Sequence, residues 1–146
     1  MAKTYLVALD SSARAPDVLK KASLLAQSTG AKLIVFRAIG LPSDLPVEAY
    51  AMSPNDVVSV LEQRGTRELA ELAKAIPAGL AHENLIAIGS PWQSICEAGR
   101  QAGAELIIIG SHGYSGIDKL LGTTASRVVN HADRSVLVVR SPTAGG

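Results

Sequence analysis

A glycine-rich segment holds the residues whose types and spacing are best suited to chemistry. Residues 110–124 read Gly-Ser-His-Gly-Tyr-Ser-Gly-Ile-Asp-Lys-Leu-Leu-Gly-Thr-Thr and follow a short apolar run. Glycine at positions 110 and 113 lets the backbone turn sharply and approach a ligand without a Cβ in the way. The closing Gly122-Thr123-Thr124 opens a predicted helix, where unpaired N–H groups and the positive end of the dipole favour a phosphate. The segment therefore predicts a loop that cradles phosphates.

A second interpretation of this segment stays open, in which its glycines only form a tight loop and cap the following helix. The segment lacks the Gly-Lys-[Ser/Thr] ending of a Walker A loop. It also lacks the Gly-x-Gly-x-x-Gly pattern of dinucleotide sites, so a nicotinamide cofactor is not supported.

Asp10 is an independent candidate for the same site. It ends the first apolar run, in Leu-Asp-Ser-Ser, and so lies at the carboxyl end of a predicted strand. If that strand neighbours the one before Gly110, Asp10 faces the glycine-rich loop. A carboxylate there could bind a ribose hydroxyl, adenine or a magnesium ion on the phosphates. The alternative is that Asp10 only helps to cap the helix that follows it.

Residues that suggest catalysis are better explained in other ways. His112 lies beside Ser111 and near Ser115, but there is no Gly-x-Ser-x-Gly elbow, and adjacent residues rarely align a base with a nucleophile. We interpret His112 as a loop residue near phosphate and predict no catalytic residue. Three scattered histidines do not make a metal site. Without an evident base, arginine finger or acidic metal cluster, the chain is at most a slow ATPase.

Five short, nearly continuous apolar runs are available to position these residues. Strands that are apolar on both faces are typical of a parallel sheet covered by helices on each side. The predicted strands are Tyr5–Leu9, Leu33–Ile39, Leu85–Ile88, Leu106–Ile109 and Val136–Val139.

Helical patterns occupy the intervals between these runs. They extend from near Pro16 to just before Gly30, from Ser53 to Pro77, from Ser90 to Gly103, and from about Thr123 to His131. Ser90 and Gln93 have the spacing of a capping box. The alternation predicts a doubly wound, five-stranded α/β sheet, with ligands bound beyond the carboxyl ends of its strands.

The bulk composition limits the class of protein. The chain has 146 residues, which fits one domain, expected over 1–141 with a flexible tail at 142–146. Its formal charge is +1 and only 3% of its residues are aromatic. These values argue against a nucleic-acid partner bound through a basic patch.

The single cysteine and the short apolar runs predict a cytoplasmic protein. Cys96 excludes an intrachain disulfide and suits a reducing compartment; it is interpreted as a small packing residue. We expect no signal peptide and no membrane partner, because the first apolar run starts at once and no run is long enough to cross a bilayer.

Five parts of the chain together resemble the universal stress protein family. They are the first strand with its Leu-Asp-Ser-Ser ending, Leu33–Ile39 as the second strand, Gly89-Ser90-Pro91, the block 110–116 and the closing 130–139. The resemblance covers almost the whole chain. It implies a five-stranded parallel sheet of order 3-2-1-4-5, of the adenine-nucleotide alpha hydrolase-like type, and usually a homodimer.

The ATP-binding branch of that family carries Gly-x2-Gly-x9-Gly-[Ser/Thr]. Here Gly110 and Gly113 match the first two glycines, and Gly122-Thr123 matches the last pair. One residue fewer separates Gly113 from Gly122 than in the family pattern, which leaves the phosphate geometry open.

The resemblance also implies a set of nucleotide-binding positions. ATP is the expected ligand, with a magnesium ion, ADP or AMP left open. The expected cofactor-binding residues are Ala8, Asp10, Ala38, Ile109, Gly110, His112, Gly113, Gly122, Thr123 and Thr124. The expected homodimer forms through the edge strand Val136–Val139. The shortened glycine spacing keeps an alternative open, a dimeric interaction module that has lost nucleotide binding.

Overall fold

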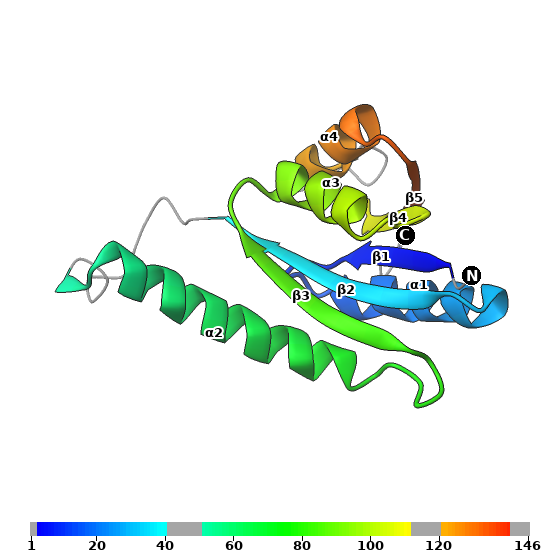
Figure 1. Ribbon diagram of the computed structural model, residues 1–146, viewed down its shortest axis with the longest axis horizontal. Helices are drawn as coiled ribbons and strands as arrows, with labels where there is room; N and C mark the ends of the chain where they lie inside the picture. The colour runs from blue at the N-terminus through cyan, green and yellow to red at the C-terminus, as the bar shows by residue number, and fades with distance from the viewer. Residues whose placement is uncertain (1–2, 41–50, 112–120, 141–146) are drawn as a thin grey trace, which may run out of the picture.

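Five parallel strands form the centre of the molecule. The computed structural model describes residues 3–40, 51–111 and 121–140. The strands are β1 (Thr4–Ala8), β2 (Lys32–Ile39), β3 (His82–Ile88), β4 (Leu106–Gly110) and β5 (Ser135–Val139). Their order in the sheet is β3-β2-β1-β4-β5 (Figure 1), which confirms the predicted α/β fold and its strand order.

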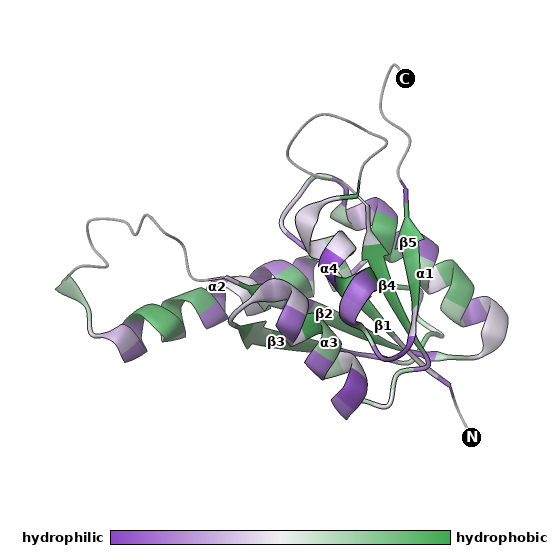
Figure 2. Cartoon of the chain, turned by 90° about the horizontal axis from the view of Figure 1, so that it is seen from above, coloured by the Kyte–Doolittle hydropathy of each residue, from purple (hydrophilic) through white to green (hydrophobic). Residues whose placement is uncertain are grey.

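Helices cover both faces of this sheet. They are α1 (Ala15–Thr29), α2 (Pro54–Ala73), α3 (Pro91–Gln101) and α4 (Thr123–His131). Helices α1 and α2 lie on one face, and α3 and α4 lie on the other (Figure 1). Figure 2 shows apolar strands between helices whose outer faces carry hydrophilic residues.

The central strands supply side chains to two separate cores, because successive residues point to opposite faces. Val7 and Ile108 pack beneath α1 and α2, whereas Leu6 and Ile107 pack beneath α3 and α4. All four side chains are fully buried. Burial on both faces explains why these strands appear in the sequence as continuous apolar runs.

Two predicted helix signals are confirmed. Gly30 ends α1 in the left-handed region, with φ 74°, as a C-terminal glycine does. The Ser53 side chain accepts a hydrogen bond from the Asp56 N–H at 3.2 Å and caps α2.

Two other helix signals are wrong. Ser90 is the N-cap of α3, but its side chain makes no capping hydrogen bond, so the predicted capping box is not formed. Helix α2 ends at Ala73 instead of continuing through Ile76 to a stop at Pro77. Three successive backbone bonds to the third preceding residue, starting at Lys74, tighten the chain out of the α-helix before the proline.

Within the three described segments, no helix combines the length and apolar character needed to cross a membrane.

Candidate functional site

The predicted site lies where the sheet changes its direction of winding. Strands β1 and β4 are neighbours, and Ala8 pairs in register with Ile109. The helix after β1 covers one face of the sheet and the helix after β4 covers the other (Figure 1). Because the two connections diverge, a crevice is expected at the carboxyl edge between these strands. The strand that ends near Asp10 therefore neighbours the strand before Gly110, as the prediction required.

Asp10 is exposed just beyond the end of β1. Its Oδ1 accepts a hydrogen bond from the Ser12 N–H at 2.9 Å, and Ser12 Oγ accepts one from the Arg14 N–H at 3.2 Å. Arg14, not Asp10, is the N-cap of α1. The carboxylate thus shapes the turn between β1 and α1 and is held at the carboxyl edge, but it does not cap the helix.

Backbone hydrogen bonds close the base of the glycine-rich loop. Ser111, which is only 6% exposed, continues the sheet through its N–H, which donates to the Val139 carbonyl at 3.0 Å. The Ser111 carbonyl accepts a bond from the Gly122 N–H, also at 3.0 Å. These bonds hold the end of β4 and the start of α4 together, so Gly110 lies next to the N-terminus of α4.

The N-terminus of α4 offers donors to an anion. Gly122 is its N-cap and contributes no side chain, while its carbonyl accepts the Ser126 N–H at 2.9 Å. The N–H groups of Thr123, Thr124 and Ala125 have no hydrogen-bond acceptor among the described residues. The first turn also holds no acidic side chain. Both features, together with the helix dipole, favour a bound anion.

Three apolar residues predicted to line the site differ in how exposed their side chains are. Ala8 and Ile109 are 8% and 6% exposed and pack in the core beneath α3 and α4. Ala38 is half-buried. Ala8 pairs in register with Phe36, so Ala38 and Asp10 extend equally far along their neighbouring strands. Of these three, Ala38 therefore presents the most side-chain surface near the carboxyl edge.

Two of the predicted residues, His112 and Gly113, lie outside the described residues. Sequence reasoning missed the role of Ser111, which it considered only as a nucleophile. Its burial at the end of β4 and its two backbone bonds make it the anchor of the loop. The position of Ser111 could have indicated this role, because it is the first residue after the Leu106–Gly110 strand.

Titratable groups elsewhere in the described part of the chain give no sign of a second reactive centre. Burial, and secondarily the charge of Asp133, raises the pKa of the Cys96 thiol. The His131 ring lies 4.5 Å from the Trp92 ring, and its Nδ1 is 2.8 Å from the Arg127 carbonyl. No three histidine, cysteine, aspartate or glutamate side chains in the described segments are grouped so that they could hold a metal ion.

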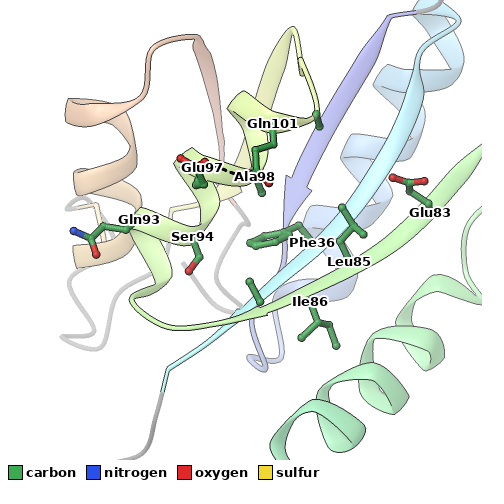
Figure 3. Close-up of a pocket in the computed structure, with 11 residues that line it drawn as sticks. Phe36, Glu83, Leu85, Ile86, Gln93, Ser94, Glu97, Ala98 and Gln101 are labelled. Carbon is green, nitrogen blue, oxygen red and sulfur yellow. Dashed lines mark hydrogen bonds between the residues drawn. The ribbon is translucent and has the colours of Figure 1, made fainter. Parts of the chain in front are cut away.

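A separate groove of about 610 Å³ lies between α3 and β3, and none of the predicted site residues lines it (Figure 3). It is therefore a different surface from the β1–β4 crevice.

Comparisons with known proteins agree with this fold. A family model described as "Universal stress protein family" matches residues 1–140. "Universal stress protein A homolog 2" of Coxiella burnetii is 30% identical over 134 residues, which cover 92% of this chain and 90% of that protein. The structure of hypothetical protein MJ0577 has a TM-score of 0.81 at 23% identity and covers 99% of both chains.

The similar structures include nucleotide complexes. One of them is described as a universal stress protein in complex with cAMP, and it has a TM-score of 0.64 at 26% identity. The similarity covers 95% of this chain and 97% of that one.

Proposed function

The chain belongs to the universal stress protein family, and we propose that it is a regulatory, stress-response protein that binds an adenine nucleotide. The ligand, ATP in the first instance, lies between Asp10 and the 110–124 loop. The nucleotide acts as a ligand or switch, and its hydrolysis is slow at most.

The N-terminus of α4 is the observation that carries this proposal. Three consecutive N–H groups, from Thr123 to Ala125, lack acceptors among the described residues. They lie at the same edge of the sheet as Asp10, beside a loop whose ends are joined through Ser111 and Gly122. Such a donor set fits phosphate oxygens. The relative solved with cAMP supports an adenine nucleotide.

Each group has a distinct role in this proposal. The α4 amides and the hydroxyls of Thr123 and Thr124 would donate to the phosphates. Asp10 would accept from a ribose hydroxyl or bind a magnesium ion on the phosphates. Ala38 would leave room for the base.

The nucleotide content of freshly purified protein tests the proposal directly. The protein is denatured, and the supernatant is analysed by absorbance and chromatography. Calorimetry with ATP, ADP and AMP, each with and without magnesium, then ranks the ligands. We expect an adenine nucleotide in the supernatant or saturable binding in the calorimeter. If both are absent, the nucleotide proposal is wrong, and the dimeric interaction module without nucleotide becomes the leading alternative.

Variants separate the charge of Asp10 from its structural bond. Asp10→Asn keeps an oxygen that can accept from the Ser12 N–H but removes the charge, and we expect binding at least about tenfold weaker. Asp56→Asn is the matched control, because Asp56 is also an exposed aspartate but lies on α2. Gly113→Val, which adds a branched side chain to the loop, should also weaken binding. Equal affinity in all three variants would place the nucleotide elsewhere.

We also infer a homodimer in which the edge strand segment Val136–Val139 meets its two-fold mate. Strand β5 has a single neighbour in the sheet, and Leu137 at its centre is 40% exposed.

The near-neutral formal charge of +1 supports the absence of a nucleic-acid partner. A cytoplasmic location remains a prediction from composition.

A further inference from the structure

The groove between α3 and β3 exists because of the sheet topology. Helix α3 connects β3 to β4, which lies on the far side of β1 and β2, so it crosses the inner strands, and the described residues leave much of one face of β3 uncovered. Leu85, on that face, is 40% exposed, and Phe36 closes the floor of the groove (Figure 3). Ser94, Glu97 and Ala98 of α3 form the opposite wall.

The outer edge of β3 presents a regular row of backbone groups. The Ala81 carbonyl accepts from the Leu33 N–H at 3.0 Å, and the Gly89 N–H donates to the Ile39 carbonyl at 2.9 Å. These bonds direct the odd-numbered residues of 81–89 toward β2, so the even-numbered residues direct their N–H and C=O groups outward. The outward groups are those of His82, Asn84, Ile86 and Ile88. Hydrogen bonds to them are absent among the described residues.

The charge of the groove is one-sided. Its lining includes Glu83 and Glu97 and no lysine, arginine or histidine. Glu83 pairs with Lys32 at 3.3 Å, and Glu97 pairs with Arg100, but all four side chains are at least 42% exposed. Exposed pairs of this kind hold their partners weakly, so both carboxylates remain able to bind an incoming cation.

We propose that the β3 edge and this groove bind an extended segment of a partner protein by strand addition. Only an extended backbone offers donors and acceptors at the two-residue interval of the four outward-facing residues. Alternate side chains of that segment lie over the uncovered face. An apolar one contacts Leu85 and Ala98, and a lysine or arginine lies against Glu83 or Glu97.

The charges favour a foreign basic segment over a second copy of this chain. Strand β3, His-Glu-Asn-Leu-Ile-Ala-Ile, contains no lysine or arginine. Pairing β3 with itself would add a second Glu83 to a groove that already carries two carboxylates. Like charges brought together in this way are unfavourable. This inference uses no residue of the proposed nucleotide site, so an experiment can contradict either proposal without affecting the other.

Synthetic heptapeptides test the inference on the full chain. The probe is acetyl-Lys-Thr-Leu-Thr-Val-Thr-Lys-amide, in which lysine and apolar residues share one strand face. Its controls replace both lysines by glutamate, or the central threonine by proline. Isothermal titration calorimetry measures affinity, and amide hydrogen exchange locates the contact. We expect the lysine peptide to bind at least about tenfold more tightly than either control and to protect the amides of His82, Asn84, Ile86 and Ile88.

Two pairs of variants make the test specific. Asn84→Pro removes one outward N–H without removing a bond to β2, whereas Asn84→Ala keeps that N–H. Glu97→Lys reverses a charge in the groove, whereas Glu62→Lys makes the same change on α2. We expect Asn84→Pro and Glu97→Lys each to weaken the lysine peptide about tenfold, and the matched controls to bind like the parent chain.

Several results would overturn the inference. They are no binding of the lysine peptide, equal binding of the glutamate peptide, or protection confined to residues outside β3. Protection of β3 that rises with protein concentration in the absence of peptide would instead assign this edge to a second copy. If Asn84→Pro does not fold, the Glu97→Lys pair and the peptide controls still decide the outcome.

Discussion

At the scale of single residues, Cys96 shows how packing suppresses a reactive group. The thiol packs against the core beneath α3 and α4. Burial is the larger cause of its raised pKa, and the negative charge of Asp133 adds to it. Since the thiolate is the reactive form, a raised pKa slows every reaction that begins with it. This agrees with its interpretation as a packing residue.

The first prediction follows from the sign of that shift. Asp133→Asn removes the charge that disfavours the thiolate, so the pKa of Cys96 falls toward its ordinary value and more thiolate is present at pH 8. We expect Cys96 to react with a disulfide reagent about two- to fivefold faster than in the parent chain, since one pKa unit is a tenfold change in thiolate. Asp56→Asn is the control and should leave the rate unchanged. An unchanged rate in Asp133→Asn would mean that burial alone controls the thiol.

At the scale of elements, α3 approaches β4 closely because position 99 is glycine. A Cβ added to Gly99 would lie 2.9 Å from Ile107 Cδ1 and 3.1 Å from its Cγ1. Ile107 is fully buried, so it has little room to move. The helix therefore depends on the missing side chain for its distance from the sheet.

We expect Gly99→Ala to destabilise the protein. Overpacking of this kind costs about 1–3 kcal/mol, against about 0.5–1 kcal/mol gained from replacing glycine within a helix. The net loss should appear in urea unfolding. Gly79→Ala is the control, because a Cβ there meets nothing within 4 Å, and it should leave stability nearly unchanged. Combining Gly99→Ala with Ile107→Val, which removes Cδ1, should give a loss smaller than the sum of the two single losses.

The same scale explains which elements could be predicted from sequence. Strand β1 was located within one residue, since Leu6 and Val7 are fully buried on opposite faces. Strand β3 begins at His82, three residues before its predicted start at Leu85. Its first four residues are exposed, so no apolar pattern marked them. A run or alternation of apolar residues in a sequence reflects side chains that are buried in the fold. An edge strand with an uncovered face buries too few side chains to produce such a pattern.

Only part of the candidate site, likewise, could be predicted from the sequence. Asp10 and Gly110 could be assigned to one edge because parallel strands place their carboxyl ends together. The bond between Ser111 and Gly122, and the groove that α3 leaves beside β3, could not be predicted. Both depend on contacts between segments distant in the chain, which no local pattern encodes.

At the scale of the whole molecule, the two edges of the sheet differ in chemistry. The β3 edge lies beside an acidic groove, whereas β5, Ser-Val-Leu-Val-Val, has no charged residue. Edges that differ in this way favour different partners. We therefore expect a second copy at β5 and a basic segment at β3. Both edges can be occupied at once, since they lie on opposite sides of the sheet (Figure 1).

The last prediction concerns the β5 edge. Leu137 is the central residue of the strand and is 40% exposed, so a two-fold axis through the middle of β5 brings two copies of it together. Leu137→Glu would place two carboxylates face to face and remove apolar contact. We expect this variant to sediment as a monomer at concentrations where the parent chain sediments as a dimer. Val60→Glu is the control, since Val60 is 42% exposed on α2, and it should remain dimeric. A parent chain that is already monomeric would refute the dimer, and a Leu137→Glu variant that stays dimeric would place the association away from this strand.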